Sequence, residues 1–168
     1  AAGDLAFTSG EFDKAREIQQ GLLPQVIPRA PGFQIAGAWQ PARSVGGDYY
    51  DIFELGEGRL ALVIADVSGK GLAAALLMSN LQAAVRAFAA ETATPAELGA
   101  RVNRMISGHI TAGRFITFFY TIPDTRSRRL AYANAGHNPP LLRGGDGQVR
   151  TLDRGGTVLG LFRDASYE

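Results

Sequence analysis

Apolar residues recur along the chain at two spacings, one typical of helices and one typical of strands. Over residues 11–23 they fall at helical spacing and stop at Pro24, which predicts a first helix. Residues 72–90 predict a second helix, apolar on most sides and therefore largely buried. A third helix is predicted after Thr94, because Thr94 can cap it, Pro95 suits the first helical position and Glu97 completes a capping box.

Shorter apolar runs between turn residues predict strands. Residues 60–65 form an unbroken aliphatic run, and turn residues at 123–127 and 144–147 indicate hairpins. The predicted strands cover residues 33–39, 60–65, 115–122, 130–135, 141–143 and 148–152. Two adjacent helices flanked by antiparallel hairpins predict a layered α+β fold rather than a doubly wound parallel sheet.

Composition excludes several classes of protein. The 168 residues suit one domain, and a net charge of +1 gives no electrostatic case for nucleic acid or an anionic membrane as partner. The absence of cysteine excludes disulfides and thiolate metal sites. No apolar run reaches the roughly 18 residues expected of a membrane span, so we expect a cytoplasmic location.

Two aspartates stand where a metal site would suit them. Asp66 follows the buried aliphatic run and precedes a turn with glycines, where a backbone can approach a ligand closely. Asp48 follows Gly46 and Gly47 at a loop-to-strand boundary, and Asp51 comes three residues later. Such carboxylates suit Mg²⁺ or Mn²⁺, and two ions about 3.5–4 Å apart can hold a hydroxide for attack on a phosphoryl group. The alternative is that these aspartates only serve turns and caps.

Other chemistry has less support in the sequence. Segment 68–71 invites comparison with a phosphate-binding loop but lacks the upstream glycine that such loops require. His137 ends a predicted strand, where a turn hydrogen bond and a catalytic role are both open. His109 and His137 are too far apart in the sequence to predict a zinc site. No serine lies in a Gly-x-Ser-x-Gly elbow, which argues against an acyl-transfer hydrolase.

Three segments, in order along the chain, resemble the signature blocks of one family. They are Pro-Ala-Arg-Ser-Val-Gly-Gly-Asp-Tyr-Tyr-Asp at 41–51, Ala-Asp-Val-Ser-Gly-Lys-Gly at 65–71 and Asn-Ala-Gly-His-Asn-Pro-Pro at 134–140. Together they are similar to the SpoIIE/RsbU-type branch of the PPM (protein phosphatase 2C-like, metal-dependent) serine/threonine phosphatases. Residues 15–24 also resemble the segment that joins such domains to an upstream sensor domain.

The resemblance implies a fold, a reaction and roles for four residues. The implied fold is a four-layer α-β-β-α sandwich of two antiparallel sheets flanked by helices. The implied reaction is hydrolysis of phosphoserine or phosphothreonine by a hydroxide that bridges two Mn²⁺ or Mg²⁺ ions. By motif position, Asp48 and Asp66 would be catalytic residues and side-chain metal ligands. Val67 would offer its main-chain carbonyl to the second metal. Arg43 is near enough in the sequence to contact the substrate phosphate, and the alternative for it is an exposed loop arginine.

The resemblance also implies a substrate and a signalling role. The implied substrate is a phosphorylated STAS-type anti-sigma-factor antagonist, so the protein would act in bacterial partner-switching signalling that regulates a sigma factor. The alternative is a phosphatase-like interaction module without catalysis. The first helix is also a candidate dimer interface, in which Ile18 would contact a second copy.

The same resemblance predicts how the chain is organised. Residues 1–10 would be a tail or linker remnant, 11–24 a linker or switch helix, and 25–168 the N-terminal portion of the phosphatase domain. The family's Asp-Gly-x-x-Glu motif and a later aspartate, which supply further metal ligands, have no match in this chain. We therefore expect a C-terminally incomplete domain with weak or absent metal binding, low activity and uncovered apolar sheet surface.

Overall fold

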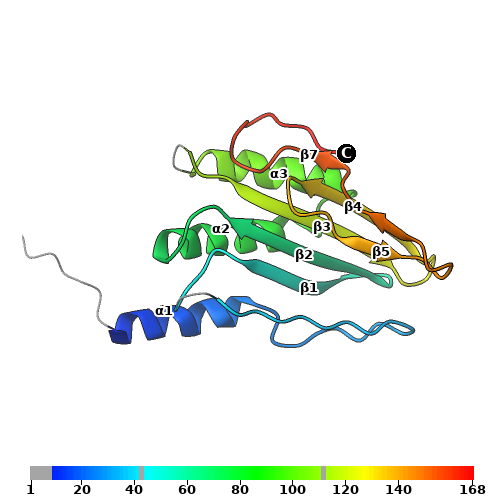
Figure 1. The fold of residues 1–168 in the computed structure, drawn as a ribbon, viewed down its shortest axis with the longest axis horizontal. Helices are drawn as coiled ribbons and strands as arrows, with labels where there is room; N and C mark the ends of the chain where they lie inside the picture. Colours follow the sequence, from blue (N-terminus) through cyan, green and yellow to red (C-terminus); the bar gives the residue numbers. More distant parts are fainter. Residues whose placement is uncertain (1–8, 42–43, 111–112) are drawn as a thin grey trace, which may run out of the picture.

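A computed structural model describes residues 9–41, 44–110 and 113–168, which form helices on one side of an open sheet (Figure 1). The helices are α1 (Ser9–Leu22), α2 (Leu72–Phe88) and α3 (Pro95–Ser107). The strands of the main sheet are, in spatial order, β1 (Tyr49–Gly56), β2 (Arg59–Val67), β3 (Ile116–Asp124), β4 (Arg129–Ala135) and β7 (Gly155–Gly156). β5 (Leu141–Arg143) and β6 (Val149–Thr151) pair separately as a hairpin. The predicted α+β class is confirmed.

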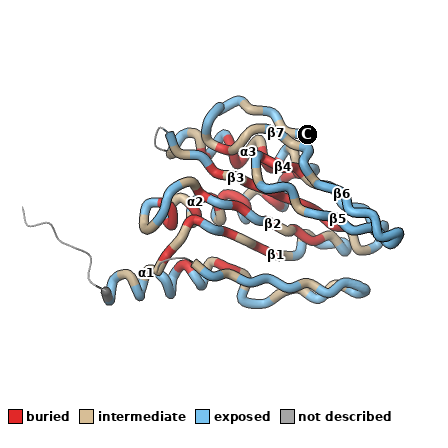
Figure 2. The backbone as a smooth tube through the Cα atoms, in the orientation of Figure 1, coloured by how far each residue is buried: buried red, intermediate tan, exposed pale blue. Residues whose placement is uncertain are grey.

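The main sheet is antiparallel except where β7 pairs parallel with β4. One face of it carries the hydrophobic core beneath α2 and α3 (Figure 2). Alternate residues of β2, such as Val63 and Val67, are buried against the helices, whereas Ile64 on the opposite face is 44% exposed. This alternation follows from the two-residue period of a strand. It assigns every strand residue to a helix-covered face or an open face.

Several local predictions are confirmed by hydrogen bonds. The Thr94 hydroxyl accepts from the Glu97 amide at 3.2 Å, and the Glu97 carboxylate accepts from the Ala93 amide at 2.9 Å, which closes the start of α3. Asp124 accepts from the amides of Arg126 and Ser127 in the β3–β4 turn. None of the helices in the described ranges is long and apolar enough to cross a membrane.

Two predictions about local structure are wrong. Residues 33–39 contain no strand, because this segment lies over the open face instead of at a sheet edge, where its backbone would join a ladder. At Gly37 the segment contacts the Tyr50 ring so closely that a β-carbon would overlap it. α2 is also less buried than its composition suggests, since Leu76 is 60% exposed.

The second stacked sheet stays a prediction. In the described parts of the chain, the β5–β6 hairpin is the only sheet besides the five-stranded one. The open face carries apolar side chains that no helix covers, but they differ in exposure: Ile64 is 44% exposed, whereas Phe119 is only 4% exposed. The uncovered apolar surface that the sequence predicts is therefore limited, and Ile64 belongs to it.

Candidate active site

Asp48 and Asp66 meet at the open end of the β1–β2 hairpin. In this hairpin Tyr49 lies opposite Ala65. The same register, carried one residue further, sets Asp48 opposite Asp66. The Val67 amide donates to the Gly47 carbonyl at 3.4 Å, which extends the pairing past both aspartates. Two carboxylates that are separate in the sequence are therefore neighbours on the open face of the sheet.

The electrostatics of this pair favour a cation. Partial burial raises the pKa of Asp66 above its usual value, and the charge and hydrogen bond of Asp48 raise that pKa further. His137 acts in the opposite direction on the pKa of Asp66. Like charges directly opposite each other on a sheet are destabilising. A divalent cation between the two carboxylates would relieve that repulsion.

Gly47 allows the loop and the end of β2 to approach each other closely. A β-carbon at Gly47 would lie 2.8 Å from the Val67 carbonyl oxygen and 3.2 Å from the Ala74 β-carbon. The first distance is shorter than real β-carbons show and the second is tighter than most, so only glycine fits without displacement. The Val67 carbonyl consequently lies beside the backbone that carries Asp48.

His137 joins the aspartates from a different part of the chain. Its backbone amide donates to Asn134 at 2.8 Å, and its ring Nδ1 lies 2.8 Å from the Thr117 hydroxyl. Burial lowers the pKa of His137, while the charges of Asp66 and Asp48 act in the opposite direction. The turn hydrogen bond expected from the sequence is present, and the ring is also electrostatically coupled to both aspartates. Thr117 was not predicted; its place on β3, opposite Asp66, depends on strand register.

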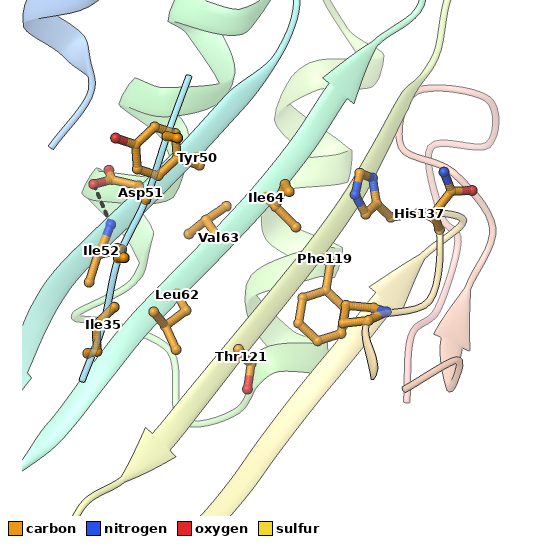
Figure 3. Close-up of a pocket in the computed structure, with 15 residues that line it drawn as sticks. Ile35, Tyr50, Asp51, Ile52, Leu62, Val63, Ile64, Phe119, Thr121 and His137 are labelled. Atoms are coloured by element: carbon orange, nitrogen blue, oxygen red, sulfur yellow. Dashed lines mark hydrogen bonds between the residues drawn. The ribbon is translucent and has the colours of Figure 1, made fainter. Parts of the chain in front are cut away.

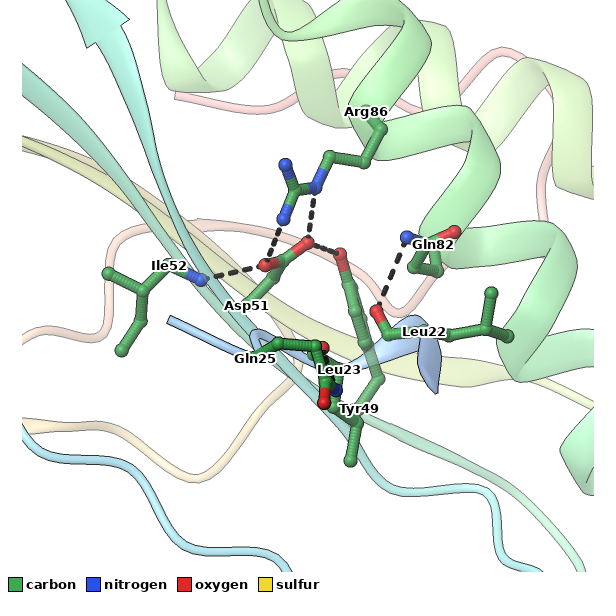
Figure 4. Close-up of polar contacts among 8 residues, drawn as sticks. All are labelled: Leu22, Leu23, Gln25, Tyr49, Asp51, Ile52, Gln82 and Arg86. Atoms are coloured by element: carbon green, nitrogen blue, oxygen red, sulfur yellow. Dashed lines mark hydrogen bonds and ion pairs between the residues drawn. The ribbon is translucent and has the colours of Figure 1, made fainter. Parts of the chain in front are cut away.

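Asp51 does not belong to this site, although it is close in the sequence. It lies on the helix-covered face of β1 and is fully buried. Its carboxylate accepts from the Arg86 guanidinium, the Tyr49 hydroxyl and the Ile52 amide (Figure 4). These bonds make it a structural anchor between β1 and α2.

Arg43 lies outside the described residues. Among the residues that the structure describes, there is no group of three or more His, Cys, Asp or Glu side chains placed to hold a metal ion. The two carboxylates, Asp48 and Asp66, lie opposite each other in the extended β1–β2 register, and the Val67 carbonyl lies beside Gly47.

A hollow of about 500 Å³ runs along the open face next to His137 (Figure 3). Its floor is mainly apolar, with Leu62, Ile64 and Phe119 from β2 and β3. Residues 35–38 form its opposite wall. The polar site thus borders an apolar surface on the same face of the sheet.

The class of protein follows from the fold, and the family follows from the sequence match. The structure is similar to the SiaA-PP2C domain of Pseudomonas aeruginosa, with a TM-score of 0.73 and 23% identity, over 95% of this chain and 64% of that one. The fold is therefore that of a PP2C-type domain. Residues 56–168 match the family described as Stage II sporulation protein E (SpoIIE), and the chain belongs to that family.

Two curated relatives extend the match towards the N-terminus. Protein IcfG of Synechocystis sp. (strain ATCC 27184 / PCC 6803 / Kazusa) is 32% identical over 94% of this chain and 29% of its own length. Phosphoserine phosphatase RsbU of Bacillus subtilis (strain 168) is 32% identical over 94% of this chain and 47% of its own length. The chain thus spans less than half of either relative. The family predicted from the three signature blocks is confirmed.

Proposed function

We propose that this chain is part of a metal-dependent protein phosphatase that hydrolyses phosphoserine or phosphothreonine. The observation that carries the proposal is the placement of Asp48 opposite Asp66, with the charge of Asp48 raising the pKa of Asp66. Membership of the SpoIIE family and similarity to a protein named phosphoserine phosphatase support the same conclusion.

The donor set fits a hard divalent cation. Asp48 and Asp66 offer carboxylate oxygens and Val67 offers a carbonyl, the ligands that Mg²⁺ and Mn²⁺ prefer. When bound, two such ions would supply a hydroxide and neutralise phosphoryl charge. The three donors would supply only part of the ligands of such an ion, so water, phosphate oxygens or other protein groups would complete the set.

The surrounding residues would orient the substrate. Because Nδ1 of His137 faces the Thr117 hydroxyl, Nε2 is the ring nitrogen left for a phosphoryl or leaving-group oxygen. Arg43, two residues after Pro41, is proposed as a phosphate contact. The exposed Asp48 and Asp66 leave the site accessible to a phosphorylated loop of another protein.

The substrate and pathway are proposed from the family resemblance. The substrate would be a phosphorylated STAS-type anti-sigma-factor antagonist, and residues 11–24 would connect an upstream sensor to the phosphatase domain at 25–168. Ile18 on α1 is 69% exposed, which leaves it accessible to a second copy of the chain. Homodimerisation through α1 remains a prediction.

A second candidate is a phosphatase-like interaction module without catalysis. It is favoured by one observation: the described residues hold no group of three or more metal-ligating side chains. It is opposed by the placement of both aspartates, because a binding module gains nothing from two facing carboxylates.

The test is hydrolysis of a phosphoserine-bearing STAS-type protein and of p-nitrophenyl phosphate, with and without Mn²⁺. We expect turnover that requires Mn²⁺, that is lost in Asp66→Asn and that persists in Asp153→Asn, an exposed aspartate outside the site. Calorimetric titration with Mn²⁺ separates the two candidates further. The absence of both Mn²⁺ binding and turnover would favour the interaction module, and turnover that ignores both Mn²⁺ and Asp66→Asn would refute the proposed site.

A further inference from the structure

α1 buries a glutamine and exposes an isoleucine. Gln19 is only 3% exposed, whereas its neighbour Ile18 is 69% exposed. Of the α1 side chains described, Gln19 is the only one classed as fully buried. Burial of a polar side chain costs free energy unless it is hydrogen-bonded, so its partners should explain its position.

Both partners of Gln19 are the backbone groups of one residue, Gly46. The Gln19 Nε2 donates to the Gly46 carbonyl at 2.8 Å, and the Gly46 amide donates to the Gln19 Oε1 at 3.0 Å. The side-chain amide therefore pairs with a peptide group as a neighbouring strand would. This pairing joins α1 to a loop 27 residues further along the chain.

The loop that Gln19 holds is the one that carries Asp48. In this loop, Gly46, Gly47 and Asp48 each form a backbone hydrogen bond with a different part of the molecule. Gly46 is held by Gln19, the Gly47 carbonyl accepts from the Val67 amide, and the Asp48 carbonyl accepts from the Trp39 indole at 3.2 Å. Of these supports, only the one from Gln19 pairs both backbone groups of a residue.

We propose that Gln19 is a positioning residue for the metal site, which sets the place of Asp48 through the Gly46 peptide. The inference rests on the proposed metal role of Asp48. Gln19 contacts the loop directly, because both of its hydrogen bonds are to Gly46. α1 thereby contributes to the geometry of the site without touching substrate or metal.

The experiment compares methionine substitutions of three glutamines whose side chains differ in their hydrogen bonds. Gln19→Met keeps the length of the side chain and removes both bonds to Gly46. Gln20→Met is the matched control, because Gln20 is the adjacent residue and is exposed. Gln82→Met removes the bond from α2 to the Leu22 carbonyl, and so loosens the end of α1 without touching the loop.

Two readouts are needed, one with metal and one without. Mn²⁺ affinity, followed by electron paramagnetic resonance, should fall roughly 10- to 100-fold in Gln19→Met, the range typical of residues that orient ligands. It should be unchanged in the Gln20 and Gln82 variants. In the metal-free protein, hydrogen exchange of residues 44–49 should be faster in Gln19→Met alone, because the Gly46 amide loses its acceptor.

The outcomes distinguish failure of the positioning role of Gln19 from failure of the proposed metal site. Equal Mn²⁺ affinity and equal exchange in wild type and Gln19→Met would overturn the positioning role. So would an equal loss in Gln82→Met, since the effect would then come from docking of α1 as a whole. If the wild type binds no Mn²⁺, the proposed function fails, and the exchange of residues 44–49 still decides whether Gln19 orders the loop. Should Gln19→Met fail to fold by circular dichroism, Gln19→Glu, which keeps the acceptor for the Gly46 amide, replaces it and should give an intermediate loss.

Discussion

Arg86 of α2 and Asp51 of β1 are joined by two hydrogen bonds of 2.7 Å, Nε to Oδ2 and Nη2 to Oδ1. The Asp51 side chain is fully buried, whereas the Arg86 side chain is 41% exposed. The guanidinium also lies 4.1 Å from the centroid of the Phe53 ring. A carboxylate inside the core is thus compensated by a cation at its edge.

This asymmetry predicts how much the arginine contributes to stability. Arg86→Leu would leave the Asp51 carboxylate buried without its cation, which typically costs about 3–5 kcal/mol. Arg101 gives a matched control, because it also pairs with a carboxylate, Glu91 at 2.9 Å, and stacks over a ring, that of Phe88. Both members of that pair are substantially exposed, so Arg101→Leu should cost about 1 kcal/mol or less. Urea unfolding of both variants measures the difference; equal losses would contradict the argument.

The close approach at Gly47 predicts that two adjacent glycines respond differently to alanine. Gly47→Ala would place a β-carbon 2.8 Å from the Val67 carbonyl oxygen. We expect a loss of about 1–3 kcal/mol in the free energy of unfolding, as for other overpacked sites, together with weaker Mn²⁺ binding. At Gly46 the nearest atom would be 3.5 Å away, so Gly46→Ala should change both quantities little. Urea unfolding and Mn²⁺ titration of the pair check this, and similar behaviour would show that space at Gly47 is not limiting.

The facing carboxylates predict that removing one of them, Asp66, stabilises the metal-free protein. Burial and the Asp48 charge both raise the pKa of Asp66, so both disfavour its charged form. Asp66→Asn removes that charge and should raise the melting temperature slightly in the presence of a chelator. The rise should be small, because Asp66 is exposed to solvent. Asp153→Asn should leave the melting temperature unchanged, and a fall in Asp66→Asn would mean that the carboxylate has a stabilising partner.

The β3–β4 turn predicts a stability difference that depends on pH. Hydrogen bonds from the Ser127 hydroxyl, and then from the Ser127 and Arg126 amides, lower the pKa of Asp124. A lowered pKa in the folded state stabilises the fold above the unfolded-state pKa of about 3.9. That contribution is lost as the pH falls through the folded-state pKa. The gap in melting temperature between wild type and Asp124→Asn should therefore be present at pH 6 and close below pH 3; a gap independent of pH would rule out the charge as its source.

Much of the architecture was predictable because it is encoded locally. The capping box of Thr94 and Glu97 and the turn chemistry at Asp124 depend on residues within a few positions of each other, and both are present as expected. Asp48 and Asp66 were predicted from motif context, and the β1–β2 hairpin places them together. Their roles as ligands, with that of Val67, stay predictions.

What the sequence could not reveal depends on contacts between distant residues. Asp51 resembles Asp48 in its context, and its pairing with Arg86, 35 residues away, is a contact that no local pattern reveals. Gln19 looks like one of two equivalent glutamines until its pairing with Gly46 is known. Residues 33–39 alternate like a strand but lie on the face of the sheet, which no local pattern distinguishes from an edge.

The register of the β1–β2 hairpin also has a consequence for the order of folding. Asp48 and Asp66 are brought together by a local turn, and isolated hairpins form within about 1–10 μs. Thr117, by contrast, reaches Asp66 only when β2 and β3 pair across 51 residues that include two helices. Closing that longer loop costs more entropy and belongs to slower, non-local assembly. We therefore expect the β1–β2 hairpin to bring the two carboxylates near each other before the side chains from β3 that border them arrive.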